Sequence, residues 1–331
     1  MQAITLLKYG GPKNFSYCEV PKPKPKDNEV LVKIHVTTIN DYDWCMMRGN
    51  PFIYRLMFGL FKPKHSIGGM ELSGEIEGIG KNVSVFNIKD HVYGDISEYG
   101  FGTFAQYICI NEQALRLKPN NMSFEDACTI PHASMLAYQG LIKIGQLNNY
   151  NSNQKKKNLN ILINGAGGGV GSFALNIAKQ FKTTVTGVDT GEKLENMTTI
   201  GFDHVIDYKK IDFSTQKNKY DIIFDTKQTR SPLSILKSLN ENGQYITVGG
   251  DLPRIFQTLI FKPLIKLFSK KRVSILALKA NADLDKIEEM YNNGVIKPVI
   301  DGPYSLEKIP ELIELFGNGK HTGKIVINVH H

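Results

Sequence analysis

A run of small residues between two regular patterns is the part of the chain best suited to bind a charged ligand. The run Ala166-Gly-Gly-Gly-Val-Gly171 follows an apolar stretch typical of a strand and precedes a helical pattern. In such a turn Gly168 lets the backbone approach a pyrophosphate, and Gly171 lets the helix pack closely on the strand. The free N–H groups at the start of the helix then bind the pyrophosphate of a dinucleotide. The predicted binding residues are Ala166, Gly168, Gly169, Val170 and Gly171.

An acid and two further polar residues stand where the next strand is expected to end. Asp189 lies close to the spacing expected for a carboxylate that binds the hydroxyls of the adenine ribose. A carboxylate repels a 2′-phosphate, so Asp189 favours NAD(H). Thr190 and Lys193 lie in the same turn and could bind that phosphate. The local chemistry therefore leaves both nicotinamide cofactors open.

The formal net charge of +8 raises the question of a nucleic-acid partner. Short basic runs occur at Lys22–Lys26, Lys155–Lys157 and Lys270–Arg272, without interleaved aromatic residues and without a known binding motif. Such runs are typical of solvated loops, and a positive field also attracts phosphorylated cofactors. We expect no nucleic-acid partner.

The cysteine pattern and the N-terminus indicate an intracellular protein. Cys18, Cys45, Cys109 and Cys128 lack CxxC spacing, so neither a disulfide framework nor a cysteine zinc knuckle is expected. No stretch reaches the roughly 18 apolar residues that would span a bilayer. Strand-like sequence begins by Ala3 without the leader pattern of a secreted protein. We predict a cytoplasmic location.

The hydrophobic period changes along the chain, which indicates two domains of an α/β protein. Residues 1–122 contain short strands separated by turns. From Ser123, an expected helix N-cap, the segment 123–294 alternates strands with helices, as in a doubly wound parallel sheet. Residues 295–331 return to short strands, and we expect them to complete the first domain. The Asn/Lys-rich tract 148–158 is expected to form a surface loop.

Several short motifs occur in an order that is familiar from one family. They are Tyr9-Gly-Gly-Pro12, Glu29-Val-Leu-Val-Lys33, Asn40-x-x-Asp43, Val85-Phe-x-x-x-Asp90-x-Val-Tyr-Gly94, Gly102-Thr-Phe-Ala-Gln-Tyr107, Ala166-Gly-Gly-Gly-Val-Gly171, Asp203-His-Val-Ile-Asp-Tyr208 and Gly323-Lys-Ile-Val326. Together they resemble the zinc-free quinone oxidoreductase (ζ-crystallin-like) branch of the medium-chain dehydrogenase/reductase superfamily over nearly the whole chain. Asn176 departs from the family's signature, which has Gln at that place in the helix after the glycine turn.

The resemblance implies a GroES-like β domain, a Rossmann domain and hydride transfer to quinones, enones or related carbonyl compounds. Lys193 and Tyr208 match positions that contact the 2′-phosphate in NADPH-using relatives, whereas Asp189 departs from that pattern. We favour NADP(H) over NAD(H) because two matching residues oppose one departure. The resemblance also implies a homodimer made by joining Rossmann sheets edge to edge, through Val273–Leu278.

Two of the three metal positions of zinc-dependent relatives are filled here by poor ligands. Asn40 stands at the first Cys position and Met70 at the His position, and only His132, at the third, is a good zinc ligand. The stretch between Gly94 and Gly102 lacks the four-cysteine cluster of a second zinc site. We predict a site without zinc.

Without a Lewis acid an alcohol is hard to activate, so we expect reduction of an electron-poor acceptor. The amide of Asn40 is a candidate donor to the substrate oxygen, or a turn cap. Asp43 is expected to order that loop or bind ribose rather than act as a base. Tyr42 and Tyr54 are alternative donors, or ordinary aromatic packing. His132 could relay a proton, or be satisfied structurally at a helix end.

Two apolar stretches allow more than one reading. Pro51–Phe61 is expected to line the acceptor site, the alternative being packing against the β domain. Leu252–Leu267 ends near the basic run Lys270–Arg272. It could lie on a membrane surface, close over the cofactor or pack between subunits. We do not expect a membrane partner.

Two other functions compete with a reductase. One is a catalytically silent protein that binds the cofactor and acts through a lipid or protein partner. The other is an alcohol dehydrogenase with a rebuilt metal site. Oxidation of NADPH or NADH by quinones and enones separates the first from a reductase, and stoichiometric zinc would indicate the second.

Overall fold

The computed structural model describes residues 1–152, 158–217, 219–250 and 252–330. The run Lys155–Lys157 and much of the loop expected at 148–158 lie outside the described residues.

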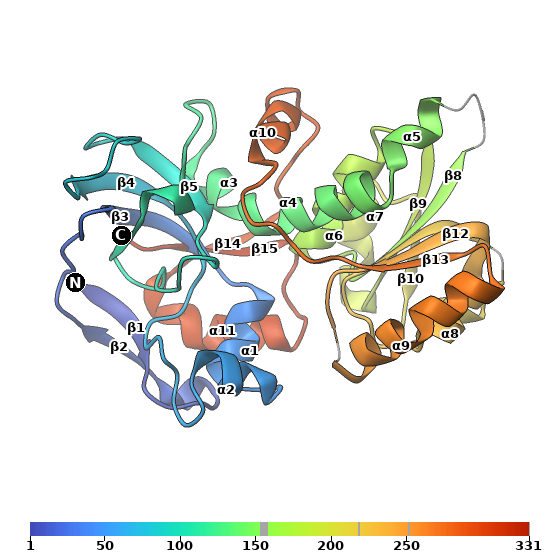
Figure 1. The fold of residues 1–331 in the computed structure, drawn as a ribbon, viewed down its shortest axis with the longest axis horizontal. Helices are drawn as coiled ribbons and strands as arrows, with labels where there is room; N and C mark the ends of the chain where they lie inside the picture. The colour runs from blue at the N-terminus through green and yellow to red at the C-terminus, as the bar shows by residue number, and fades with distance from the viewer. Residues whose placement is uncertain (153–157, 218, 251, 331) are drawn as a thin grey trace. The chain divides into compact units, whose positions relative to one another are not determined.

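The chain divides into two compact units, drawn in Figure 1. The first comprises Met1–His132, Ala280–Ala282 and the C-terminal segment from Ile300. The second comprises Ala133–Lys279 and Asp283–Val299.

The first unit is built on a seven-stranded sheet and a separate hairpin of β1 and β2. The sheet order is β14-β15-β3-β4-β5-β7, with β6 paired to β3. β14 and β15 are parallel, and the other pairs are antiparallel. The strands are β1 Gln2–Leu6, β2 Phe15–Glu19, β3 Glu29–Thr38, β4 Glu71–Ile79, β5 His91–Asp95, β6 Tyr107–Asn111, β7 Arg116–Leu117, β14 Ile300–Ser305 and β15 Lys324–Asn328.

Short helices cover this sheet and close its core. α11 (Ile309–Gly317) places Leu312 and Ile313 in the core beside strand residues such as Val32 and Ile34. The other helices are α1 Asp41–Arg48, α2 Ile53–Phe58 and α3 Phe124–Thr129.

The second unit holds one parallel sheet of six strands in the order β10-β9-β8-β11-β12-β13. β9 and β10 follow one another outward on one side of β8, and β11, β12 and β13 follow one another outward on the other side, which is the doubly wound order of a Rossmann fold. The elements from the end of the first unit onward are α4 Pro131–Tyr138, a π-helical turn Gln139–Ile144, α5 Leu147–Ser152, β8 Leu159–Asn164, α6 Gly169–Ala178, β9 Thr183–Asp189, α7 Leu194–Thr199, β10 His204–Asp207, β11 Tyr220–Asp225, α8 Pro232–Ser238, β12 Leu239–Thr247, α9 Leu252–Phe268, β13 Arg272–Ile275 and α10 Leu284–Asn292.

The predicted α/β fold class is confirmed, since an antiparallel β body accompanies a doubly wound parallel sheet. The boundary between the units lies later than the sequence suggests. Ser123 caps α3 as expected, accepting from the Asp126 N–H at 3.0 Å. However, α3 belongs to the first unit, because the Ser73 hydroxyl on β4 donates to the Phe124 carbonyl at 2.7 Å and Cys128 packs into that unit's core.

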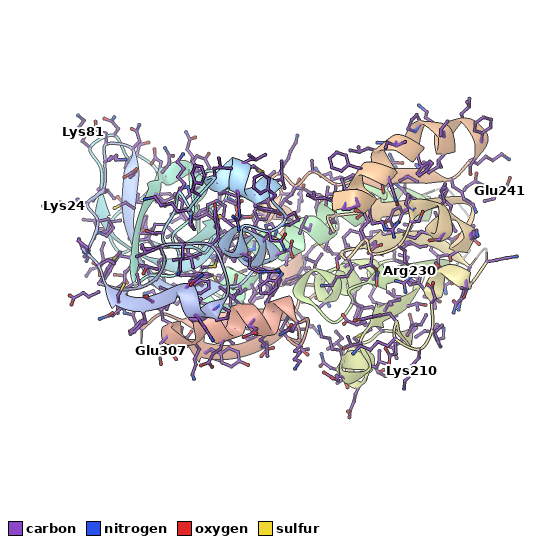
Figure 2. All side chains as sticks on the ribbon, turned by 90° about the horizontal axis from the view of Figure 1, so that it is seen from below. Lys24, Lys81, Lys210, Arg230, Glu241 and Glu307 are labelled. Atoms are coloured by element: carbon purple, nitrogen blue, oxygen red, sulfur yellow. The ribbon has the colours of Figure 1, made fainter. Side chains whose placement is uncertain are left out.

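The basic runs that the structure describes lie on the surface with acidic neighbours. Lys22 contacts Glu77 at 2.6 Å and Lys270 contacts Glu241 at 2.9 Å. Figure 2 shows Lys24 and Glu241 directed outward. Within the described residues no helix is long and apolar enough to cross a membrane.

Candidate functional sites

The glycine turn of the second unit connects β8 to α6 in a conformation that only glycine adopts easily. Gly165 has a φ of +82°, and a Cβ on it would lie 2.1 Å from the Thr226 hydroxyl. A Cβ on Gly171 would lie 2.5 Å from the Cα of Ala166, so this helix residue must be glycine for α6 to approach the turn. The turn therefore holds the start of the helix close to the end of the strand.

The first turn of α6 offers backbone donors. Gly168 is the N-cap residue, and no described side chain caps the helix there. The amides of Gly169, Val170 and Gly171 come before Ser172, whose N–H donates to the Gly168 carbonyl at 3.0 Å within the helix. These three amides therefore remain available to an anion at the positive end of the helix. These features fit the pyrophosphate of a dinucleotide.

Asp189, at the end of β9, ties this turn to the next loop. Its Oδ2 accepts from the Gly167 N–H at 2.9 Å, and its Oδ1 accepts from the Thr190 N–H at 2.8 Å. The ammonium of Lys193 lies 3.6 Å from Oδ1, and both side chains are buried. A Cβ on Gly167 would lie 2.6 Å from the Cδ of Lys193. Gly167, absent from the predicted set, thus makes room for the pair.

The predicted ribose-binding residues come together at the carboxyl ends of two neighbouring strands. Asp207 of β10 pairs with Asp189 of β9, and the N–H of Tyr208 donates to the Asp189 carbonyl at 3.1 Å. Tyr208 is exposed, whereas Asp189 and Lys193 are buried. Because Lys193 compensates the charge of Asp189, this acid repels a 2′-phosphate less than its position in the sequence suggests.

A separate polar cluster lies in the first unit, where the ends of several neighbouring strands of its sheet meet. β3 ends there at Thr38, β4 and β15 begin there at Glu71 and Lys324, and Asp95 lies opposite Glu71 in the pairing of β4 with β5. The strand pairing therefore brings residues far apart in the sequence to the same place.

Glu71 is the centre of this cluster. Its Oε2 accepts from the Lys324 ammonium at 2.5 Å, the Thr38 hydroxyl at 2.5 Å and the Asn40 amide at 2.8 Å. Thr38, Glu71, Asn40 and Lys324 are all buried, and we call these four residues the Glu71 hub. A buried carboxylate with three donors is well satisfied.

Asn40 does not have the free amide expected of a substrate donor. Its Nδ2 donates to Glu71 and, at 3.3 Å, to the Thr38 hydroxyl, while its Oδ1 accepts from Lys324 at 2.5 Å. The amide is thus engaged within the protein, and the side chain is buried. This arrangement favours a structural role for Asn40 over contact with the substrate.

Asp43 orders the loop between β3 and α1. Its carboxylate accepts from the N–H of Asn40 at 2.9 Å and from that of Gly69 at 3.0 Å, forming a capping box on α1. Burial raises the pKa of Asp43 to about 7, against the lowering effect of these backbone hydrogen bonds. The fully buried carboxyl fits the loop-ordering role that the sequence suggested.

His132 at the start of α4 is held at both its backbone and its ring. The His132 N–H donates to Glu71 Oε1 at 2.7 Å, and its Nδ1 lies 2.8 Å from Asp95 Oδ2. Asp95 itself accepts from the Ser97 N–H at 2.9 Å. We call Asp95 and His132 the Asp95–His132 dyad.

The dyad favours a protonated imidazole. Burial alone lowers the pKa of His132, but the hydrogen bond and charge of Asp95 outweigh it, so that the net pKa is raised. Within the described residues the Nε2 of His132 makes no hydrogen bond, and the side chain keeps 11% of its surface exposed. An imidazolium with one bound and one free N–H can donate a proton.

A row of aromatic rings begins beside this imidazole. The Tyr42 ring lies edge-on to His132 at 6.3 Å and to Tyr54 at 6.0 Å. Tyr54 stacks on Phe58 at 6.1 Å, and Phe58 meets Phe101 edge-on at 5.4 Å. Burial raises the pKa of Tyr54, which keeps its phenol neutral. We call Tyr42, Tyr54, Phe58 and Phe101 the aromatic row; each ring is half-buried or exposed.

Sequence reasoning did not assign roles to Glu71, Lys324 and Asp95. Lys324 appeared only inside the motif Gly323–Val326, Glu71 was not singled out beside Met70, and their separation of 253 positions leaves no local pattern. For Asp95 we find no signal in the sequence. Among the described residues no group of three or more His, Cys, Asp or Glu side chains could hold a metal ion.

The chain is similar to known proteins over almost its full length. Residues 26–120 match the family described as alcohol dehydrogenase GroES-like domain, and residues 200–327 match the one described as zinc-binding dehydrogenase. The chain is 31% identical to the chloroplastic quinone-oxidoreductase QR1 of Triphysaria versicolor, covering 99% of this chain and 98% of that protein. It is 28% identical to the mitochondrial NAD(P)H oxidoreductase RTN4IP1 of Dictyostelium discoideum, covering 99% and 96%.

Solved structures share the fold. The quinone oxidoreductase from Coxiella burnetii has a TM-score of 0.81 at 24% identity, covering all of this chain and 99% of that one. The Escherichia coli quinone oxidoreductase complexed with NADPH has a TM-score of 0.79 at 19% identity, covering 99% and 100%. At these identities the likeness supports the architecture.

Proposed function

The chain belongs to the quinone oxidoreductase branch of the medium-chain dehydrogenase/reductase superfamily, and we propose that it is an NAD(P)H-dependent reductase of quinones, enones or related conjugated carbonyl compounds. Relatives named quinone oxidoreductase, 2-methylene-furan-3-one reductase and alkenal/one oxidoreductase support this activity class. The observation that carries the proposal is the Asp95–His132 dyad beside the aromatic row, in a chain that also has a pyrophosphate-binding turn.

The first unit supplies the groups that bind and protonate the acceptor. The aromatic row offers faces and edges against which a flat conjugated ring can pack. His132 Nε2 delivers a proton to the acceptor oxygen as negative charge develops there, while Asp95 holds the ring and stabilises its charged form. Tyr54, a neutral phenol, is a further donor to that oxygen.

The second unit binds the cofactor at the glycine turn and at the end of β9. The bound reduced nicotinamide supplies the hydride. NADPH is the favoured form, because the buried Asp189–Lys193 pair removes much of the repulsion that a bare Asp189 would exert on a 2′-phosphate. The relative named NADPH-dependent alkenal/one oxidoreductase agrees with this choice.

The reaction proceeds without zinc in this proposal. The Lys324 ammonium contacts Glu71, so a positive charge already lies where a metal would need the carboxylate. Asn40 and Met70 are poor ligands, and Met70 is fully buried. The donor set does not fit zinc.

We also propose that the protein forms a homodimer and lies in the cytoplasm. A homodimer would form through β13, which is the last strand of its sheet in the described residues, although it ends at Ile275 rather than Leu278. The cytoplasmic location remains a prediction. The names of several relatives place those proteins in chloroplasts or mitochondria.

The test is an assay in which a panel of quinones and enones oxidises NADPH or NADH. The oxidation is monitored as the loss of absorbance of the reduced nicotinamide. Turnover that is faster with NADPH is expected. Cofactor binding without oxidation by any acceptor would instead indicate a catalytically silent protein. Zinc at stoichiometric level, lost together with activity on chelation, would indicate an alcohol dehydrogenase.

The glycine turn has its own test. A valine in place of Gly168 puts a side chain where the pyrophosphate must approach, so Gly168→Val should abolish detectable NADPH and NADH binding. The melting temperature should stay near that of the parent, showing an intact fold. Retained affinity in a calorimetric titration would contradict the assigned turn.

A further inference from the structure

Helix α9 of the second unit turns an apolar face toward solvent. Most of its large apolar side chains on this face are about half or more exposed, and Phe268 reaches 80%. Helices on a protein surface ordinarily place polar residues on the solvent side. The exposed apolar residues are Phe256, Leu259, Ile260, Leu264, Leu267 and Phe268.

This face is not required to hold the helix in place. Thr258 and Ile265, on the opposite side, are buried, and Phe261 packs against the core of the second unit. The hydroxyl of Thr258 accepts from the Gln228 amide at 2.7 Å. α9 lies with α8 on one side of the sheet in Figure 1. Its inner side therefore anchors it, and its outer side is free to bind something else.

The segment of the chain that carries the exposed face has charged side chains of one sign. Between Leu252 and Ala282 the chain contains no Asp or Glu. Lys262 and Lys266, one helical turn apart, are exposed and form no ion pair with any residue the structure describes. The basic residues of the segment are Arg254, Lys262, Lys266, Lys270, Lys271, Arg272 and Lys279.

We propose that α9 lies flat on the surface of a lipid bilayer that contains anionic headgroups. At 17 residues the helix is about 25 Å long, and its apolar face can enter the headgroup boundary while the flanking lysines meet lipid phosphates. Each basic side chain near such a surface adds attraction. A second copy of the chain fits this face less well, because a symmetric contact brings together two surfaces that are both basic.

Vesicle flotation tests the proposal with the full-length protein and phosphatidylcholine vesicles made with or without phosphatidylserine. Binding is expected to the anionic vesicles and to weaken as salt is added. Paired changes Leu259→Gln with Leu267→Gln, and Lys262→Glu with Lys266→Glu, should each weaken binding at least about tenfold. All four side chains are exposed, so the fold should be unaffected.

Matched controls lie on the neighbouring helix α8. Leu233→Gln and Lys237→Glu change an exposed leucine and an exposed lysine there, and both should leave vesicle binding unchanged. No binding to anionic vesicles, or an equal loss in the α8 controls, would overturn the proposal. So would an α9 variant that dissociates an oligomer in light-scattering chromatography, since a second copy would then cover this face.

Discussion

Each of the two units contains a buried carboxylate paired with an ammonium, and the pairs differ in how they are built. Asp189 and Lys193 are four positions apart on one turn, with 3.6 Å between oxygen and nitrogen. Glu71 and Lys324 lie 253 positions apart and are joined at 2.5 Å by the sheet. The local pair shapes a loop beside the glycine turn. The distant pair holds together the ends of three strands and the start of α4 through hydrogen bonds to Glu71.

This difference predicts unequal costs of breaking the pairs. Lys324→Met leaves the Glu71 carboxylate buried without its ammonium, which should cost about 3–5 kcal/mol of unfolding free energy. Lys193→Met should lower the free energy of unfolding by less than Lys324→Met does, because Asp189 keeps two backbone N–H donors. Urea unfolding of both variants measures the contrast.

The double variant Glu71→Gln with Lys324→Met is the control for the Glu71 hub, because it removes both charges. It should recover much of the stability lost in Lys324→Met. Equal stability of the single and double variants would show that the buried charge is not the reason for the loss.

The dyad attached to the Glu71 hub should control turnover. His132→Asn removes the proton donor and should lower kcat roughly a hundredfold, with little change in NADPH affinity. Because Asp95 raises the pKa of His132, the imidazolium is present at lower pH and is lost as pH rises through that pKa. The activity of the parent should therefore fall on the alkaline side, and the variant should lack this fall.

Two further variants separate the chemistry from the fold. Asp95→Asn keeps a hydrogen-bond acceptor but removes the charge, so the alkaline fall should move to lower pH. His91→Asn changes an exposed histidine outside the dyad and should leave the profile as it is. If the pH dependence of activity were the same in His132→Asn as in the parent, His132 would be excluded as the proton donor.

The smallest effect is expected at the local pair of the second unit. Lys193→Ala removes a cation and uncovers the charge of Asp189, so NADPH affinity should fall roughly tenfold or more while NADH affinity changes little. Adding Asp189→Asn should restore part of the NADPH affinity. Equal losses for the two cofactors in Lys193→Ala would show that the 2′-phosphate is not bound there.

The sequence predicted the fold class and the glycine turn, because both depend on short-range patterns. Strand and helix periods lie within tens of residues, and Gly168 and Gly171 are recognisable from their place at the junction of β8 and α6. For Asn40 the sequence left two roles open, a donor to the substrate oxygen or a turn cap, and the structure favours a structural role. The partners that engage its side chain, Glu71 and Lys324, were not visible from local spacing.

By itself, then, the sequence determined that short strands build one part of the chain, that strands alternate with helices in the other, and that a glycine turn joins β8 to α6. Backbone geometry in these places follows from residues that adjoin one another. Only the tertiary structure decided which side chains share the Glu71 hub and the dyad. Strand pairing brings together the strand ends that carry Thr38, Glu71, Asp95 and Lys324, and no spacing along the chain encodes this proximity. The apolar outer face of α9 was likewise decided by which of its sides packs on the core.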